Sequence, residues 1–252
     1  AYVVAIGGAN MDIIGRGSAH LMPHDSNPGH ISASPGGVAR NQAHNLRLLD
    51  IDVKLITVLG DDMYGDNIRQ HGRALGIDIS EAITIPNGRT SIYLSITDEK
   101  RELQYGISDM DLYEQLAQQT IEPRMGIINK AAACVVDTNI PQQTLEYLAD
   151  NATPPLFVET VSAAKIARVK NILGSIDTLK ADQVDLQHLM GYETQTDEQV
   201  NKAADELLRS VIKNLYIHLL GERRVFCADD QQRFIMNVGS PAEANAQRIV
   251  LK

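Results

Sequence analysis

The chain has 252 residues, of which 44% are hydrophobic and 22% are charged, a composition typical of a globular protein and not of a disordered one. Asp and Glu (32) outnumber Lys and Arg (23), which gives a net charge of −9 at pH 7. A surface of this sign repels phosphate backbones, so we expect no nucleic acid polymer as a partner. No apolar stretch approaches the roughly 20 residues of a membrane span, and the first residues form no basic leader, so we expect no membrane partner and a cytoplasmic protein.

The first part of the sequence alternates strand and helix patterns. Residues 2–6 are a β-branched run that ends at a Gly-Gly pair, which predicts a buried strand. Residues 38–49 place apolar side chains at helical spacing, directly after a Pro-Gly-Gly break. Residues 54–60 predict a second strand, and the helix pattern that follows it stops at Gly76. This order is typical of a parallel sheet with helices on both faces.

Two segments interrupt this alternation. Residues 13–35 are rich in His, Pro, Ser and Gly, and residues 88–107 alternate apolar and polar side chains as a half-exposed hairpin does. We expect them to form a small sheet over one end of the main one. Further strands are predicted at 132–139, 155–162, 176–183 and 215–222. The sequence therefore predicts one α/β domain, with a core of residues 1–12, 36–87 and 108–252 and a β lid of residues 13–35 and 88–107.

Polar residues and glycines recur at the carboxyl ends of the predicted strands. In an open parallel sheet, ligands gather at these ends. The residues concerned are Asn10, Asp12, Gly36, Gly37, Asn41, Asp137, Asn139, Glu159, Ser162, Lys180, Asp182, Asp185 and Gly221. Polar residues scattered at random over a surface would not recur at successive strand ends. The pattern therefore predicts a single ligand-binding crevice.

Each of these residues also has a purely structural explanation. Asp12 could cap a turn, and the Gly36-Gly37 pair could serve only the start of a helix instead of a close approach to a ligand. Asn41 could make a contact at the helix start or a contact with a ligand. The segment GGANMD is not the Gly-x-Gly-x-x-Gly fingerprint of dinucleotide-binding enzymes, and no Walker A motif occurs. A nicotinamide-dependent oxidoreductase therefore lacks its sequence signal.

Cysteine and histidine give no sign of a metal or disulfide framework. Cys134 and Cys227 each lie in an apolar run, where we expect them to be buried as small hydrophobic residues. His20, His24 and His30 lack zinc-ligand spacing, so we expect a solvated segment.

The run SPGGVARNQAHNLRLLDIDVKLITVLGDDMYGD (34–66) resembles the first signature of the ribokinase (PfkB) family. The signature combines a Gly-Gly pair, an Asn four residues on, a helix, a strand and a Gly-Asp-Asp turn. The resemblance extends over nearly the whole chain to about residue 236. It implies a ribokinase-like three-layer α/β sandwich with a mostly parallel central sheet and a small β lid. The implied reaction is ATP-dependent phosphorylation of a sugar or ribonucleoside hydroxyl, with Mg²⁺, a possible monovalent cation and a homodimer formed through the lid.

The resemblance also implies roles for residues. Asp12, Gly37 and Asn41 would hold the sugar hydroxyls, and the two lid segments would close over them. The substrate-binding residues expected in all are Asn10, Asp12, Gly36, Gly37, Asn41, Asp109, Asn139 and Lys165. Residues 180–185 (KADQVD) stand where the family has Asn-x-x-Glu, which helps to organise magnesium and phosphate. The nucleotide-binding residues expected are Lys180, Asp182, Asp185 and Gly221, with Asp185 acting indirectly on the metal.

Three segments are similar to pseudouridine kinases within this family: residues 107–114, 135–148 and 157–169. The similarity implies that Asp109 lies near the base and Lys165 near the site, so our best prediction is pseudouridine 5′-phosphorylation. A solvated lysine on a helix face is the other interpretation of Lys165. Another sugar kinase of the ribokinase or fructokinase kind is the alternative substrate class.

One motif of the family is missing. The catalytic Thr-x-Gly-Ala-Gly-Asp should follow the strand near residue 236, and the sequence does not contain it, so the catalytic base is unassigned. Two explanations stay open. The sequence could join parts of a longer protein and omit this turn, or the turn could be truly deleted, which would leave a non-catalytic sugar-binding relative.

Overall fold

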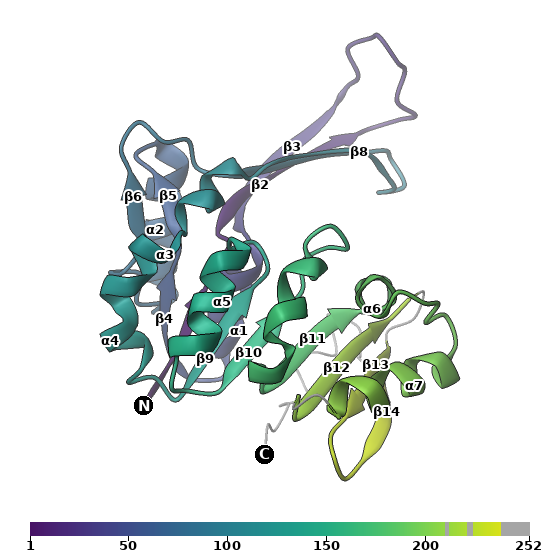
Figure 1. Cartoon of the computed structure of the whole chain (residues 1–252). Coiled ribbons are helices and arrows are strands. Elements are labelled where there is room, and N and C mark those ends of the chain that lie inside the picture. The colour runs from purple at the N-terminus through teal and green to yellow at the C-terminus, as the bar shows by residue number, and fades with distance from the viewer. Residues whose placement is uncertain (210–211, 221–223, 238–252) are drawn as a thin grey trace.

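The computed structural model describes residues 1–209, 212–220 and 224–237, and its centre is an eight-stranded sheet (Figure 1). The strand order is β14-β13-β12-β11-β10-β9-β1-β4. All neighbours from β4 to β12 pair in parallel, whereas β13 and β14 are antiparallel. The strands are β1 (Tyr2–Ile6), β4 (Asp52–Ile56), β9 (Ala133–Asp137), β10 (Leu156–Glu159), β11 (Thr178–Asp182), β12 (Asn214–Leu219), β13 (Arg224–Ala228) and β14 (Arg233–Asn237).

Helices cover both faces of this sheet around β1, because that strand is apolar on both sides. Along β1, Ala5 belongs to one core with residues of α1 (Val38–Leu48) and α2 (Met63–Ala74), while Val4 and Ile6 belong to a second core on the opposite face. Complete burial of a Val or Ile side chain such as Val4 or Ile6 contributes roughly 1.5–3 kcal/mol. The helices of the second face are η1 (Asp111–Gln115), α3 (Gln118–Ile121), η2 (Glu122–Arg124), α4 (Met125–Ile128), α5 (Gln142–Asn151), η3 (Ile166–Ser175), α6 (Gln183–Met190) and α7 (Asp197–Leu208).

The predicted lid is a separate four-stranded sheet that extends away from the main body (Figure 1). Its strands are β2 (Asn10–Gly17), β3 (Gly29–Gly36), β7 (Ile92–Thr97) and β8 (Leu103–Asp109), in the order β3-β2-β7-β8. Asp12 pairs across the strands with Tyr93, and Tyr93 pairs with Ser108, so these three side chains share one face. We call it the inner face of the lid, because it borders the cavity described below.

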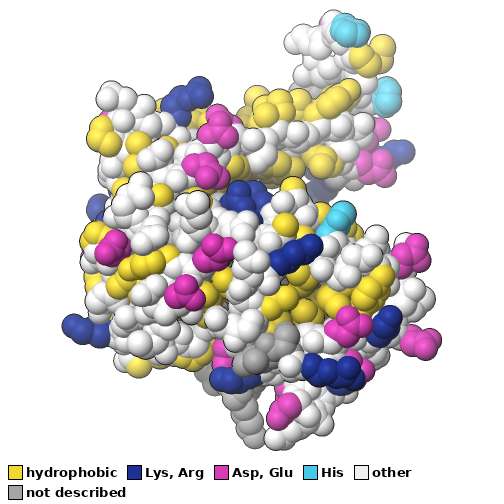
Figure 2. Space-filling view, in the orientation of Figure 1, with side chains coloured by type: hydrophobic (Ala, Val, Ile, Leu, Met, Phe, Trp, Pro, Cys, Tyr) yellow, Lys and Arg dark blue, Asp and Glu magenta, His cyan; other side chains and the backbone are white. Residues whose placement is uncertain are grey.

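The opposite, outer face of the lid is apolar. Ile13 and Leu94 are cross-strand partners on it, and Leu94 pairs in turn with Ile107. Ile31 is 82% exposed and Tyr105 66% exposed, although both are large hydrophobic side chains. Figure 2 shows hydrophobic side chains gathered on the lid.

The strand predicted at residues 54–60 is divided in two. After β4 the chain leaves the main sheet, and β5 (Val58–Gly60) pairs instead with β6 (Ile83–Ile85). Thr57 lies at the break, fully buried, and its hydroxyl donates to the carbonyl of Gly7 at 2.7 Å. An apolar run alone does not reveal such a change of sheet, because both pieces are equally buried.

The exposure predicted for the three histidines and the burial predicted for the two cysteines agree with the structure. His20, His24 and His30 are all exposed, and among the described residues no group of three His, Cys, Asp or Glu side chains is placed to hold a metal ion. Cys134 in β9 and Cys227 in β13 are buried free thiols, and burial raises the pKa of both, that of Cys134 to about 12. No helix within the described ranges has the length and apolar character needed to cross a membrane.

Candidate functional site

A cavity of about 510 Å³ lies between the inner face of the lid and the carboxyl ends of the central strands. We call it the strand-end cavity. Six of the predicted substrate-binding residues line it, namely Asn10, Asp12, Gly37, Asn41, Asn139 and Lys165. The rest of its lining is Val38, Tyr93, Ser108, Met110, Tyr113, Val161 and Ser162.

A larger hollow of about 770 Å³ lies on the outer face of the lid, around residues 13–31. Its walls are apolar lid residues such as Ile31 and Leu94 together with the loop of the β2–β3 hairpin. No strand end of the main sheet reaches it. We therefore take the smaller cavity as the candidate site, since of the two it is the one that combines convergent polar groups with the crevice of a parallel sheet.

Asp12 is held by a chain of hydrogen bonds at the base of the lid. The side-chain amide nitrogen of Asn10 donates to the carboxylate of Asp12 at 2.6 Å. The hydroxyl of Tyr113 donates to the side-chain carbonyl of Asn10 at 3.3 Å. Burial, and next the nearby Asp137, raise the pKa of Tyr113 well above its usual value, so this hydroxyl remains a donor. Gly36 leaves the space that the carboxylate occupies, because a Cβ at Gly36 would overlap Asp12. Gly36 therefore acts by making room, outside the cavity lining.

A buried carboxylate fixes the start of helix α1 against the sheet. Asp137, at the end of β9, accepts backbone N–H groups from Gly8 at 2.8 Å, Ala39 at 2.9 Å and Asn139 at 2.8 Å. Ala39 is in the first turn of α1, where the helix dipole favours negative charge. One side chain thus joins the loop after β1, the helix that bears Asn41 and the loop that bears Asn139.

Burial raises the pKa of Asp137 to about 6, from an ordinary value of 3.8, because it penalises the charged form more than the three donors favour it. Between about pH 6 and pH 4 the folded chain therefore binds this proton more tightly than the unfolded chain, and lowering the pH stabilises the fold. Relative to Asp137→Asn, the unfolding free energy of the unchanged chain should rise by up to about 3 kcal/mol across this window. Urea denaturation of both proteins at several pH values measures the difference. A difference that stays constant, or falls as the pH is lowered, would contradict the assignment.

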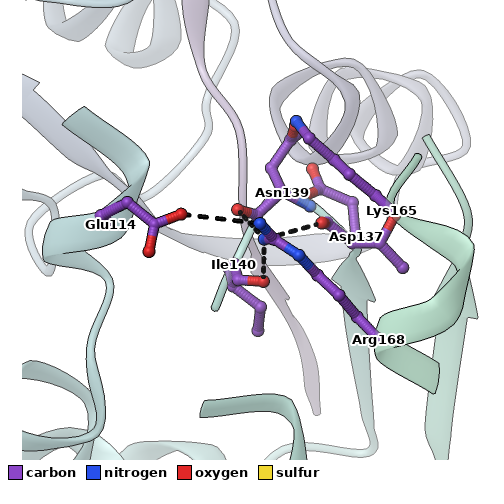
Figure 3. A network of polar contacts seen from close by, with 7 residues as sticks. Glu114, Asp137, Asn139, Ile140, Lys165 and Arg168 are labelled. Carbon is purple, nitrogen blue, oxygen red and sulfur yellow. Dashed lines mark hydrogen bonds and ion pairs between the residues drawn. The ribbon is translucent and has the colours of Figure 1, made fainter. Parts of the chain in front are cut away.

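Lys165 and Asn139 both line the cavity and form a polar end of it, where their side chains meet (Figure 3). The ammonium group of Lys165 donates to the side-chain carbonyl of Asn139 at 2.6 Å. Burial, and then the charge of Arg168, lower the pKa of Lys165. Arg168 also donates to the backbone carbonyls of Asn139 at 3.0 Å and Ile140 at 2.7 Å, and so holds the loop after β9 in place. Lys165 is therefore half-buried at the cavity and not fully solvated, and its contact with a ligand stays a prediction.

Residues 180–185 lie at the next strand end and do not line the cavity. Lys180 donates to Glu159, and Glu159 also accepts from Gln42 of helix α1. Asp185 is buried and accepts the hydroxyl of Thr160 at 2.5 Å. The stretch thus contacts the end of β10 and the loop after it, and Glu159 links it indirectly to helix α1.

The donor set at this strand end suits a hard cation. Asp182 is exposed at the start of α6 and caps no backbone N–H with its side chain, whereas the carboxylate of Asp185 is already bonded to Thr160. Mg²⁺ keeps several waters and takes one or two carboxylates together with substrate phosphates. Asp182 would hold such an ion directly, and Asp185 would act indirectly. Gly221 lies outside the described residues.

Asp109 is placed differently from its neighbours. Ser108 and Met110 line the cavity, while the Asp109 carboxylate lies 3.9 Å from the guanidinium of Arg89. Ser108 belongs to the inner face of the lid, so the next residue along the strand points away from it.

Sequence reasoning did not find Tyr93, Ser108 or Tyr113. Tyr93 and Ser108 enter the cavity only through strand register, since each is a cross-strand neighbour of another inner-face residue. Tyr113 is fully buried in the short helix η1, where an aromatic residue would be assigned to the core. The available signal was the alternation of residues 88–107, which indicates two faces without saying which one carries the ligand.

Comparisons with known proteins agree with this architecture. Residues 1–243 match the family described as pfkB family carbohydrate kinase. The chain is 35% identical over 239 residues to the uncharacterized sugar kinase YeiI of Escherichia coli (strain K12), covering 93% of this chain and 65% of the relative. It is 34% identical over 222 residues to the pseudouridine kinase of the same strain, covering 88% of this chain and 71% of the relative.

Solved structures share the fold. The ribokinase of Arabidopsis thaliana, solved in complex with ribose and ATP, matches with a TM-score of 0.79 and 18% identity over 94% of this chain and 78% of its own. The fold is thus ribokinase-like, and the chain spans 65% and 71% of the length of these two curated relatives. By the extent of the family match and the identity to these relatives, the chain belongs to the pfkB family of carbohydrate kinases.

Proposed function

We propose that the protein binds a sugar or ribonucleoside in the strand-end cavity and phosphorylates one of its hydroxyls with ATP. The observation that carries this proposal is the pairing of Asp12 and Asn41 in one cavity between the lid and the strand ends. A carboxylate accepts hydrogen bonds and a side-chain amide also donates them, which together match neighbouring hydroxyl groups. When a substrate hydroxyl is held in one geometry beside a bound phosphate donor, this positioning supplies most of the acceleration of phosphoryl transfer.

The proposed substrate is pseudouridine, phosphorylated at its 5′-hydroxyl. Lys165 lies at the polar end of the cavity, beside the apolar side chains of Met110 and Val161. A flat base with carbonyl oxygens suits such an end, since the ring packs on apolar atoms and its carbonyls accept from the ammonium group. The 34% identity to a pseudouridine kinase supports the same substrate. The alternative is another sugar, as in a ribokinase or fructokinase.

ATP and Mg²⁺ are the proposed cofactors, held by Lys180, Asp182 and Asp185 at the neighbouring strand end. When bound, Mg²⁺ offsets the negative charge of the phosphates. In this chain, Glu159 holds Lys180 at the strand end, and the lid excludes water from the hydroxyl to be phosphorylated. We assign no catalytic base among the described residues. An ATP-consuming enzyme of this kind is expected in the cytoplasm.

An ATP-consumption screen tests this function. The full-length protein is assayed with ribose, fructose, pseudouridine, uridine and inosine, in KCl and in NaCl to reveal a monovalent-cation requirement. Calorimetric binding of the same five compounds is measured in parallel. Consumption that depends on pseudouridine supports the proposal, and dependence on ribose or fructose supports the alternative. Binding without ATP consumption indicates a sugar-binding protein without catalysis, and no binding to any of the five rejects the function.

The outer face of the lid is the proposed contact surface of a homodimer. Its exposed side chains include Ile31 and Ile107, in a sheet that lies apart from the main body (Figure 2). Apolar patches of this kind on a soluble chain mark interaction sites, and a self-complementary face closes a twofold dimer.

Ile31→Glu should convert the dimer to a monomer, because each twofold contact would bury two unpaired carboxylates. Size-exclusion chromatography with light scattering measures the mass. Leu48→Glu, at a 70% exposed residue on the C-terminal turn of α1, is the matched control and should leave the mass at twice that of one chain. A wild-type mass equal to one chain, or a dimer unaffected by Ile31→Glu, rejects this surface.

A further inference from the structure

Helix α1 contains a buried arginine whose two amino groups contact different partners. Arg40 is only 6% exposed. One terminal nitrogen, Nη1, donates to the side-chain carbonyl of Asn41 at 2.8 Å, and the other, Nη2, lies 2.9 Å from Nδ1 of His71 in helix α2. Burying a guanidinium is costly unless its donors are satisfied, so this placement calls for a reason.

The contact with Asn41 determines what that side chain can offer to a ligand. Because its carbonyl oxygen Oδ1 receives the guanidinium donor, the amide nitrogen Nδ2 is the group left to face the cavity. At Asp12 the situation is reversed, since one oxygen accepts from Asn10 and a carboxylate can only accept. The cavity wall therefore presents one oriented donor and one acceptor, and an Asn41 amide turned the other way would present two acceptors.

His71 prevents the guanidinium from rotating. Arg40 is a donor only, so Nδ1 of His71 accepts and its proton is carried on Nε2. The two anchoring residues come from different helices, α1 and α2, and His71 does not line the cavity. Burial lowers the pKa of Arg40, and the charge of the nearby Asp12 opposes this shift only in part.

We infer that Arg40, anchored by His71, is a positioning residue that orients the Asn41 amide toward a substrate hydroxyl. The inference rests on the proposed function, because it assumes that the strand-end cavity holds a sugar or nucleoside. It extends the site to a residue of helix α2 that touches no ligand.

The alternative role for Arg40 is purely structural. In that case replacing it changes stability, and any loss of affinity is independent of Asn41. A double-mutant cycle between Arg40 and Asn41 separates the two, because an effect that passes through one side chain disappears once that side chain is gone.

The test measures calorimetric binding of the best ligand among ribose, fructose, pseudouridine, uridine and inosine. Arg40→Met keeps the length and removes the donors, and we expect its affinity for that ligand to fall about tenfold, as for the loss of one oriented hydrogen bond. Affinity for ATP should change less than about twofold. In an Asn41→Ala background, the same Arg40→Met change should have no further effect. His71→Gln, which keeps an acceptor, should bind within about twofold of the unchanged chain, whereas His71→Leu should bind more weakly.

Arg47→Met is the matched control, since Arg47 lies in the same helix and contacts Ile51 and Asp52, away from the cavity. Thermal melting of every variant shows that it is folded. If Arg40→Met does not fold, Arg40→Lys takes its place, because a lysine keeps the charge but cannot bridge two partners as the planar fork does. Unchanged affinity, or a tenfold loss that persists without Asn41, overturns the inference. If the unchanged chain binds none of the five compounds, the proposed function fails instead.

Discussion

Asp12→Ala is expected to bind the sugar or nucleoside at least about a hundredfold more weakly than the unchanged chain. Asp12 is the carboxylate of the strand-end cavity, and its hydrogen bonds to hydroxyl groups are charge-assisted. Each such bond contributes roughly 1.5–3 kcal/mol, so the loss of two of them corresponds to about 10²–10⁴ in affinity. The removal also leaves the amide of Asn10 without its acceptor. Calorimetry with the best of the five screened compounds measures the change.

Two further variants make this result specific. Asp12→Asn keeps the shape but replaces one acceptor by a donor, so it should lose most of the same affinity. Asp150→Ala, at an exposed carboxylate in helix α5, should leave the affinity unchanged. If Asp12→Ala binds within about threefold of the unchanged chain, the strand-end cavity is not the sugar site.

Gly37→Ala is expected to lower the free energy of unfolding by about 3 kcal/mol or more. Gly37 precedes α1 with φ 97° and ψ 142°, a backbone region that costs other residues about 1–3 kcal/mol. A Cβ there would lie 2.5 Å from the carbonyl oxygen of Gly8 and 2.6 Å from Cα of Ala9, so the backbone itself would have to move. In a chain of this size the change corresponds to a fall in Tm of roughly 10 °C.

Two other glycines of this chain distinguish backbone strain from steric overlap as the cause of the lost stability. Gly191 has a φ of 75°, and no atom lies within 4 Å of the position that a Cβ would take, so Gly191→Ala should cost only the backbone strain, about 1 kcal/mol. Gly126 lies in helix α4 with open space and no left-handed φ, so Gly126→Ala should stabilise by about 0.5–1 kcal/mol. If Gly37→Ala costs no more than Gly191→Ala, the close approach of α1 to the loop after β1 is not under steric control.

The fold could be predicted from the sequence wherever a helix or strand keeps one spacing of apolar residues along its whole length. Residues 2–6 and 38–49 became β1 and α1 almost without shift, because a β-branched run and a helical spacing are local signals. The change of sheet at Thr57 left no such signal, since it depends on a hydrogen bond to Gly7, fifty residues away. Segment 13–35 is expected to join a small sheet, but its composition does not show that it contributes to two eight-residue strands, β2 and β3.

The residues of the candidate site likewise fall into those that local sequence predicts and those that depend on distant contacts. Asp12, Gly37 and Asn41 were found because they follow predicted element boundaries, and the cavity brings these three together. The hydrogen bond between Lys165 and Asn139 joins residues 26 apart, and spacing alone left Lys165 undecided. Which lid residues lie on the inner face depends on the register between strands. The sequence alone does not determine which strands pair or in which register.

The two buried thiols can report local opening of the main sheet. Cys134 sits in a central strand and Cys227 in the antiparallel part of the sheet, and burial keeps both protonated and shielded at neutral pH. An alkylating reagent can reach either sulfur only when the packing that covers this part of the sheet opens. The two labelling rates would therefore compare the centre of the sheet with its flank, and show whether they open in one cooperative event or in separate ones.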